Sequence, residues 1–296
     1  MCFFSIVFIS ACKKESQPLE KVYRFDKIIR IDGLNRAYTI HLPANYYESS
    51  DFSLIIALHG GGGNPRQFEN TSRLSEKADA AGFIVVYPEG TGVFPTWNAG
   101  MCCGYAASQD INDVKFISLL IDQLVSAYKI NPGKIYATGH SNGGMMSYRL
   151  ACELSDKIAA IAPNGCTMVV SQLCSPKRAV PILHMHSVND QHVPYKGGTG
   201  NGITGIDNPP LDSVLNVWSL LNNCSIPAQV AVDNSRYTLT EWLACDNETA
   251  IAYYLTKDGG HAWPGGLPGR DGADVPSTAI DANDLLWEFF KQYQLP

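Results

Sequence analysis

Short apolar runs that alternate with amphipathic stretches constrain the fold of this chain more than any other feature. The run FSLIIAL at residues 52–58 has no charged residue and leads directly into the glycine-rich stretch HGGGGN. Runs of this kind are typical of strands that a parallel sheet buries on both faces. We therefore expect strands within residues 36–46, 52–60, 83–90, 134–140, 157–165, 181–188, 236–243 and 250–256.

Helical periodicity separates these runs. We expect helices at residues 66–82, 110–130, 143–155, 211–224 and 278–293, with Asp110 and Asp113 capping the second of them. Strands that alternate with helices predict an α/β fold, with one mostly parallel central sheet and helices on both faces. Such a sheet would use nearly the whole of residues 21–296, so we predict one catalytic domain there.

The net charge and the N-terminal residues limit which partners the protein can have and which compartment it can occupy. The 22 basic and 28 acidic residues give a net charge of −6, and without a basic cluster this argues against a nucleic-acid partner. Ile9-Ser10-Ala11-Cys12 resembles the lipobox of bacterial lipoproteins. We expect a signal peptide at 1–12 that ends at a lipidated Cys12, a tether at 13–20, and a secreted protein that contacts a bacterial membrane only through its lipid. The alternative is an ordinary signal peptide that is cut near Ala11.

Of the nine cysteines, Cys2 and Cys12 lie in the expected signal peptide, and the other seven support an oxidising compartment. We expect Cys224 to pair with Cys245, Cys166 with Cys174, and either Cys102 or Cys103 with Cys152. The odd number leaves at least one cysteine unpaired or bound to another chain.

A candidate nucleophile lies in GHSNGG, residues 139–144, between an expected strand and an expected helix. A strained strand-to-helix turn needs flanking glycines, and it would lift the Ser141 hydroxyl above the sheet. The alternative is a glycine-rich turn with a capping serine. The run LHGGGGN at 58–64 shifts the balance, because its amides can face a substrate carbonyl. We expect an oxyanion hole from the backbone amides of Asn142 and Gly61, with Gly62 as the next choice. The run lacks the Lys-Ser/Thr of a phosphate-binding loop.

A serine nucleophile also needs a histidine base and an acid that orients it. His261 lies in a glycine-rich loop after the last expected strand, and Asp190 follows the strand at 181–188, so we assign them as base and acid. Asp207, Asp212 and Asp258 are the alternatives for the acid.

Taken together, HGGGGN, WNAGMCCGYAASQDINDVKFI, GHSNGGMMSYRLACEL, HMHSVNDQHVPYKGG and GGHAWPGG resemble the LpqC-like branch of esterases, within the α/β-hydrolase superfamily. That branch groups polyhydroxybutyrate depolymerases with feruloyl and acetylxylan esterases of carbohydrate esterase family 1. The resemblance implies the same triad, Ser141, Asp190 and His261. It also implies that Trp97 and Asn98 form the pocket wall and that Trp263 lies beside the histidine. Two residues depart from the family pattern: Ser187 replaces a usual glycine, and Cys166 replaces a small residue.

The expected activity is that of a serine carboxylic-ester hydrolase that forms an acyl-enzyme and uses no metal or cofactor. The substrate is expected to be a feruloyl or acetyl group on plant polysaccharides or their fragments, with a polyhydroxybutyrate depolymerase as the alternative. Two remote alternatives remain: a metal-dependent hydrolase built on His184, His186, Asp190 and His192, and a non-catalytic glycan-binding protein. We expect a monomer.

Overall fold

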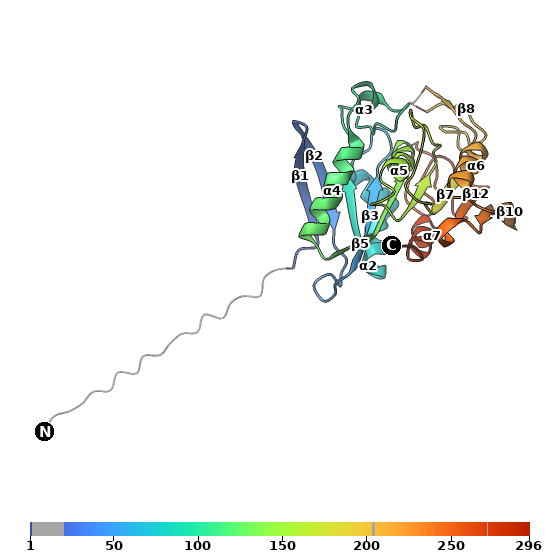
Figure 1. The fold of residues 1–296 in the computed structure, drawn as a ribbon. Helices are drawn as coiled ribbons and strands as arrows, with labels where there is room; N and C mark the ends of the chain where they lie inside the picture. Colours follow the sequence, from blue (N-terminus) through green and yellow to red (C-terminus); the bar gives the residue numbers. More distant parts are fainter. Residues whose placement is uncertain (2–20, 203–204, 271) are drawn as a thin grey trace.

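A ten-stranded sheet runs through the middle of the protein (Figure 1). The computed structural model describes residues 1, 21–202, 205–270 and 272–296. The strand order across the sheet is β1-β2-β4-β3-β5-β6-β7-β12-β11-β10. The central strands from β4 to β12 pair in parallel, whereas β1, β2, β11 and β10 pair antiparallel at the two edges. This is the predicted α/β architecture, with a mixed sheet that is parallel where the candidate site residues lie.

The strand bounds are β1 Arg24–Ile31, β2 Leu34–His41, β3 Phe52–Leu58, β4 Ile84–Pro88, β5 Ile130–His140, β6 Ala160–Asn164, β7 Ile182–Ser187, β10 Ile226–Asp233, β11 Tyr237–Leu243 and β12 Ile251–Thr256. Two short strands, β8 Gly198–Thr199 and β9 Asp207–Asn208, form a separate pair. The helices are α1 Pro65–Ser72, α2 Leu74–Ala81, α3 Gly104–Ser108, α4 Asp113–Ala127, α5 Asn142–Glu153, α6 Leu211–Leu221, the 3₁₀ helix η1 Asp246–Glu248, and α7 Ala282–Phe290.

Helices cover both faces of the sheet, and β3 shows why its sequence is apolar throughout. Leu54, Ile56 and Leu58 point into a core shared with α4, α5 and α6, whereas Ile55 and Ala57 point into a second core shared with α1, α2 and α7. Successive side chains of a strand face opposite sides, so a strand between two helical layers has no polar face.

The sequence analysis did not predict the strands β1, β8, β9 and β10, the short helices α3 and η1, or the break between α1 and α2. Strands β1 and β10 lie at the sheet edges and are largely exposed, so their sequences carry no continuous apolar run. The helix expected at 66–82 is two helices, because Arg73 adopts a left-handed conformation with φ 57° between them. A left-handed backbone conformation ends a helix, and no residue near Arg73 in the sequence predicted this break.

The prediction that Asp110 and Asp113 cap α4 is wrong. The Asn112 side chain is the N-cap and accepts from the backbone N–H of Lys115 at 2.9 Å. Asp113 is fully buried and forms an ion pair with Arg36 on β2 at 2.6 Å. Burial, the largest influence, raises the pKa of Asp113 from its usual value. The partner of Asp113 lies 77 residues away, so helix-start rules had no access to it.

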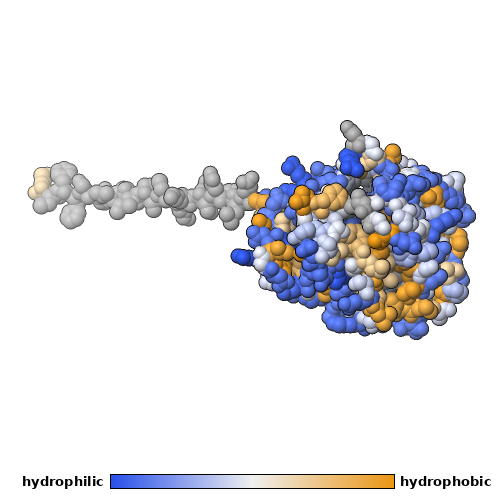
Figure 2. Space-filling view, turned by 90° about the horizontal axis from the view of Figure 1, so that it is seen from above, coloured by the Kyte–Doolittle hydropathy of each residue, from blue (hydrophilic) through white to orange (hydrophobic). Residues whose placement is uncertain are grey.

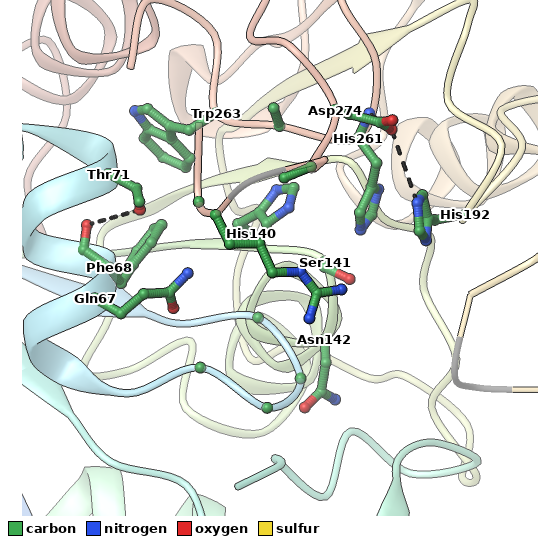
Figure 3. A pocket seen from close by; sticks show the side chains of 18 of the residues that line it. Gln67, Phe68, Thr71, His140, Ser141, Asn142, His192, His261, Trp263 and Asp274 are labelled. Carbon is green, nitrogen blue, oxygen red and sulfur yellow. Dashed lines mark hydrogen bonds and ion pairs between the residues drawn. The ribbon is translucent and has the colours of Figure 1, made fainter. Parts of the chain in front are cut away.

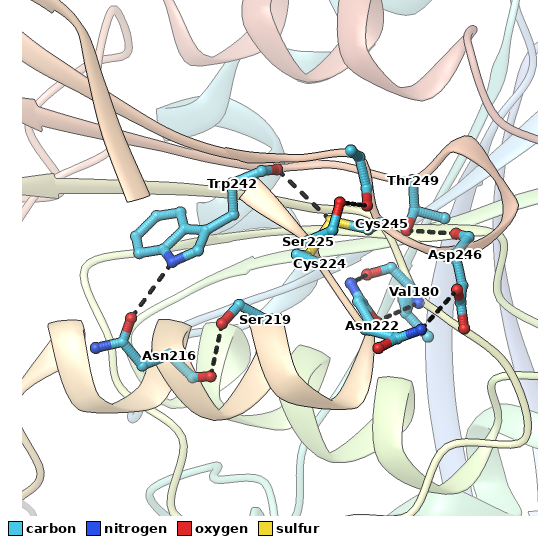
Figure 4. The surroundings of a disulfide bond; sticks show 12 residues. Val180, Asn216, Ser219, Asn222, Cys224, Ser225, Trp242, Cys245, Asp246 and Thr249 are labelled. Atoms are coloured by element: carbon cyan, nitrogen blue, oxygen red, sulfur yellow. Dashed lines mark hydrogen bonds between the residues drawn. A yellow bond between two sulfur atoms is a disulfide. The ribbon is translucent and has the colours of Figure 1, made fainter. Parts of the chain in front are cut away.

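Disulfide pairing agrees with one of the three expected bonds. Cys224 pairs with Cys245, which ties the end of α6 to the turn after β11 (Figure 4). The other two expectations are wrong: Cys152 pairs with Cys174, Cys102 pairs with its neighbour Cys103, and Cys166 is a buried free thiol. Cys166 lies beside Gly144 in the turn after β6, and Cys152 at the end of α5 is the cysteine that faces Cys174.

The surface seen from above is predominantly hydrophilic, with apolar residues in smaller patches (Figure 2). Within the residues that the structure describes, no helix is both long and apolar enough to span a bilayer. Apart from Met1, the predicted signal peptide, its lipidation at Cys12 and the tether to residue 20 lie outside the described residues.

Candidate active site

Ser141 stands on a sharp turn between β5 and α5, as the sequence predicted. Its φ of 55° and ψ of −123° are strained for a residue with a side chain. The turn requires its glycines: a Cβ on Gly143 would lie 2.1 Å from the carbonyl oxygen of Leu58, and one on Gly139 would lie 2.5 Å from the carbonyl of Gly143. Backbone atoms cannot yield that space, so the strand and helix approach closely only because these residues lack a Cβ.

Asp190 and His261 meet because their strands are neighbours. Asp190 follows β7 and His261 follows β12, and these two strands pair in parallel, so their carboxyl ends lie at the same edge of the sheet. Nδ1 of His261 lies 2.7 Å from Oδ2 of Asp190. Since an ionised carboxylate only accepts, Nδ1 carries the proton, and Nε2 of the neutral ring is left as an acceptor.

The Asp190 carboxylate is held by several donors. Its Oδ1 accepts from the backbone N–H groups of His192 and Val193, both at 2.9 Å. Burial is the largest single influence and favours the protonated form, but the hydrogen bonds from His186 and His261 outweigh it and lower the pKa of Asp190. The acid is therefore ionised throughout the neutral range.

The sequence analysis gave three residues around His261 no role beside the triad: it left His140 and Asp274 unassigned and considered His192 only as a metal ligand. The ring of His140 lies 4.5 Å from the ring of His261, and the ring of His192 lies 4.8 Å away on a stacking geometry. Asp274 accepts the backbone N–H of His261 at 2.6 Å. His140 directly precedes Ser141, and His192 lies two residues after Asp190, so their positions in the sequence hinted at both. Asp274, which is 13 residues from His261, carried no signal.

His140 is a neutral residue in this site. Burial, followed by the charge of His261, holds its pKa well below the usual value. The side-chain amide of Asn164 donates to Nδ1 of His140 at 2.8 Å and to the carbonyl of Ala262 at 3.1 Å. One asparagine thus joins the residue before the serine to the residue after the catalytic-histidine candidate.

Ser141 and His261 line the same pocket, which has a volume of about 410 Å³ (Figure 3). The glycine loop at residues 60–63 forms one side of it, and Phe68, Phe94 and Trp263 contribute apolar surface. A Cβ on Gly62 would overlap the Phe94 ring at 2.1 Å, so this glycine lets the ring lie against the loop.

The expected oxyanion donors are free to act. Among the described residues, neither the Gly61 nor the Asn142 backbone amide donates to a protein acceptor, and both residues line the pocket. The Gly62 amide instead donates to the carbonyl of Pro95 at 2.7 Å. This favours Gly61 over Gly62, the order that the sequence suggested.

The family described as phospholipase/carboxylesterase matches residues 48–200, which is more than half of the chain and includes Ser141 and Asp190. The chain belongs to this family.

Two of the curated relatives carry related names. The chain is 27% identical over 269 residues to a bifunctional acetylxylan esterase/xylanase of Neocallimastix patriciarum, covering 89% of this chain and 34% of that protein. It is 28% identical over 269 residues to feruloyl esterase B of Piromyces equi, covering 88% of this chain and 46% of that protein. The chain therefore spans between a third and a half of the length of these curated relatives.

Comparison with solved structures shows the same fold. The acetyl xylan esterase from Aspergillus awamori superposes with a TM-score of 0.63 at 15% identity, over 90% of this chain and 99% of that one. This confirms the predicted α/β-hydrolase fold.

The placement of Trp97 and Asn98 in the pocket wall is wrong for this member of the phospholipase/carboxylesterase family. Neither residue lines the pocket, and both are buried behind the turn. The Trp97 backbone N–H and carbonyl bind the side chain of Asn142 at 2.7 and 3.0 Å, and the Trp97 indole donates to the carbonyl of His59 at 3.0 Å. Trp97 thus braces the strand-to-helix turn. Trp263, by contrast, does line the pocket, two residues after His261.

The histidines that suggested a metal site are divided between the buried side of the site and the pocket. His184 and His186 are buried and engage protein partners at both ring nitrogens, whereas His192 lies on the pocket side. Among the described residues, no three His, Cys, Asp or Glu side chains are grouped to hold a metal ion.

Proposed function

We propose that this protein is a serine carboxylic-ester hydrolase in which Ser141 attacks the ester, His261 is the general base and acid, and Asp190 orients His261. The observation that supports this most strongly is the 2.7 Å contact from His261 Nδ1 to an ionised Asp190, with His261 and Ser141 lining one pocket. That tautomer leaves Nε2 free to take the serine proton.

The reaction proceeds in two acyl transfers. His261 takes the Ser141 proton as the oxygen attacks the ester carbonyl, and the amides of Gly61 and Asn142 stabilise the oxyanion, at about 3 kcal/mol for each donor. His261 then gives the proton to the departing alcohol, which leaves the acyl group on Ser141. Water repeats the sequence and releases the acid.

For the substrate we propose a feruloyl or acetyl ester on a plant polysaccharide or a fragment of one. The aromatic surface from Phe68, Phe94 and Trp263 is suited to a planar phenolic acyl group, and the volume of about 410 Å³ exceeds what an acetyl group fills. The names of the relatives, feruloyl esterase and acetylxylan esterase, support the same class.

Parallel assays of Ser141→Ala and the wild type on p-nitrophenyl acetate, methyl ferulate, acetylated xylan and 3-hydroxybutyrate oligomers test both proposals. We expect Ser141→Ala to lose at least 10³-fold in kcat on every ester, as triad variants do. The matched control is Ser147→Ala on the same helix, because the Ser147 hydroxyl donates to the carbonyl of Gly143 and does not line the pocket. It should retain activity.

A serine-directed phosphonate should add once to the wild type, at Ser141, and not to Ser141→Ala. Full activity in Ser141→Ala would overturn the mechanism. A preference for 3-hydroxybutyrate oligomers over methyl ferulate and acetylated xylan would overturn the substrate class and favour a polyester depolymerase.

A further inference from the structure

Behind Asp190, on the side away from the pocket, three buried residues form a continuous hydrogen-bonded chain. The hydroxyl of Tyr148 on α5 lies 2.8 Å from Nδ1 of His184, and Nε2 of His184 lies 3.2 Å from Nδ1 of His186. Nε2 of His186 then lies 2.8 Å from the carbonyl of Val193 and 3.3 Å from Oδ2 of Asp190. None of the three residues is more than 2% exposed, and none lines the pocket.

The partners of this chain fix where its protons are. Nε2 of His186 faces two oxygens that can only accept, so it carries a proton. In the neutral ring, Nδ1 of His186 then accepts, so Nε2 of His184 donates to it. Nδ1 of His184 in turn accepts from the Tyr148 hydroxyl. Burial keeps His184 and Tyr148 uncharged, because it lowers the pKa of the former well below and raises that of the latter well above the usual values.

The opposite placement of the protons would leave one buried donor without an acceptor. If His186 were a cation, both of its nitrogens would donate, and His184 would have to accept at Nε2 and donate at Nδ1 toward Tyr148. The Tyr148 proton would then need another acceptor, and the described residues offer it no hydrogen bond besides the one to His184. A buried donor without an acceptor costs about 1–3 kcal/mol.

Every donor in the chain therefore points toward Asp190, whose Oδ2 is shared. It accepts from His261 on the pocket side and lies within reach of His186 from behind. The N–H at Nε2 of His186 is hydrogen-bonded to the Val193 carbonyl and lies 3.3 Å from the same Oδ2, so its positive end weakens the attraction of Oδ2 for the His261 proton. It also holds the carboxylate against rotation, together with the two backbone N–H groups on Oδ1.

We propose that His186, oriented by His184 and Tyr148, is a positioning residue that holds Oδ2 of Asp190 and sets the pH at which His261 becomes protonated. This rests on the proposed esterase function. The other titratable groups that face His261 are His140, His192 and Asp274, and the Cys166 thiol lies near Asp190. The hydrogen-bonded residues Tyr148, His184 and His186 differ from these groups because they approach Asp190 only from the buried side.

The proton positions can be measured without any activity. In a ¹⁵N-histidine-labelled sample, long-range ¹H–¹⁵N correlation spectra report which ring nitrogen is protonated. We expect the ring protons of His184 and His186 to lie on Nε2, with Nδ1 of each ring as an acceptor. A protonated Nδ1 on His186 would overturn the proposal even if the protein is an active esterase. Conversely, an inactive wild type would refute the proposed function and leave this test intact.

Kinetics test the effect on His261. His186→Leu removes the donor, so Oδ2 of Asp190 becomes a stronger acceptor for His261 and favours its protonated form. The acidic limb of kcat/KM should move to higher pH by about one unit, with kcat lowered about tenfold. His186→Gln keeps an N–H near the position of Nε2 and should restore the wild-type limb. Tyr148→Phe should produce a smaller shift in the same direction.

Tyr253→Phe is the matched control. Its ring also packs on His184, at 5.7 Å, but its buried hydroxyl has no partner among the described residues. Its pH profile should equal that of the wild type. If folded His186→Leu and Tyr148→Phe lower kcat but leave the acidic limb of the kcat/KM profile in place, these hydrogen-bonded residues are only structural and the proposal fails. If His186→Leu does not fold, Tyr148→Phe and the spectra decide.

Discussion

The two sides of the candidate active site are built on opposite principles. The frame behind it consists of buried polar residues with fixed partners, each at most 3% exposed: Arg36, His59, Asp113, His184 and Asp190. The mouth consists of loop residues open to solvent, and Phe94 and Leu267 there are 53% and 50% exposed. Buried polar groups are costly unless fully paired, whereas exposed side chains can change freely. The frame is therefore expected to fix the chemistry, and the mouth to select the substrate.

The largest expected effect on stability comes from breaking the frame at Asp113. Asp113→Ala leaves the guanidinium of Arg36 buried without its counter-ion and removes the acceptor of the Asn98 backbone N–H. We expect the free energy of unfolding to fall by about 3–5 kcal/mol. Urea unfolding at pH 7 measures this loss.

The control for Asp113 lies on the same helix. Asp122 forms an exposed ion pair with Lys157, so Asp122→Ala should cost less than about 1 kcal/mol. Equal losses from the two variants would mean that the frame is no more constrained than the surface.

Acid should weaken the frame before it affects the mouth. Burial lowers the pKa of His59 to about 4. Neutral His59 donates from Nδ1 to the carbonyl of Gly60 and accepts from the Gly90 N–H at Nε2, at 2.7 and 2.9 Å. Below pH ~6.5 the unfolded chain binds a proton that the folded chain does not, so stability falls as the pH drops from about 6.5 toward 4.

The contribution of His59 is about 3.5 kcal/mol at most, since its pKa falls by about 2.5 units and one pKa unit is worth about 1.4 kcal/mol. Urea unfolding from pH 7.5 to 4.5 should show this loss, with His140 and His184 adding to it in the same direction because their pKa values are also lowered. His59→Gln removes one titrating group and should have a shallower pH dependence. The same slope in both proteins would contradict the assignment.

The smallest effect on stability is expected at the mouth. Phe94→Ala removes an aromatic wall that is half exposed, so the free energy of unfolding should change by less than about 1 kcal/mol. KM for methyl ferulate should rise about tenfold with kcat nearly unchanged, because the ring contributes binding and not chemistry. The KM for p-nitrophenyl acetate should change less.

Val93→Ala is the control for Phe94. Val93 is its fully exposed neighbour and does not line the pocket, so its KM should match the wild type. A large fall in kcat or stability in Phe94→Ala would show that the mouth belongs to the frame.

Local rules were enough to predict part of this protein from its amino-acid sequence. Apolar runs marked the central strands because both faces of the sheet are covered, and glycines at 139 and 143 marked the turn at Ser141 because no Cβ fits there. Chain order was enough to select Asp190 and His261, which the structure brings to 2.7 Å.

Folding settled the features that depend on contacts between distant segments. The folded protein pairs Asp113 with Arg36 rather than using it as a helix cap, joins Cys152 to Cys174, and buries Trp97 behind the site rather than in the pocket wall. It also aligned Tyr148 and His184 with His186, which single-sequence patterns cannot do because the hydroxyl comes from another element. A polar residue in a local pattern has several possible partners, and burial selects among them only when the chain has folded.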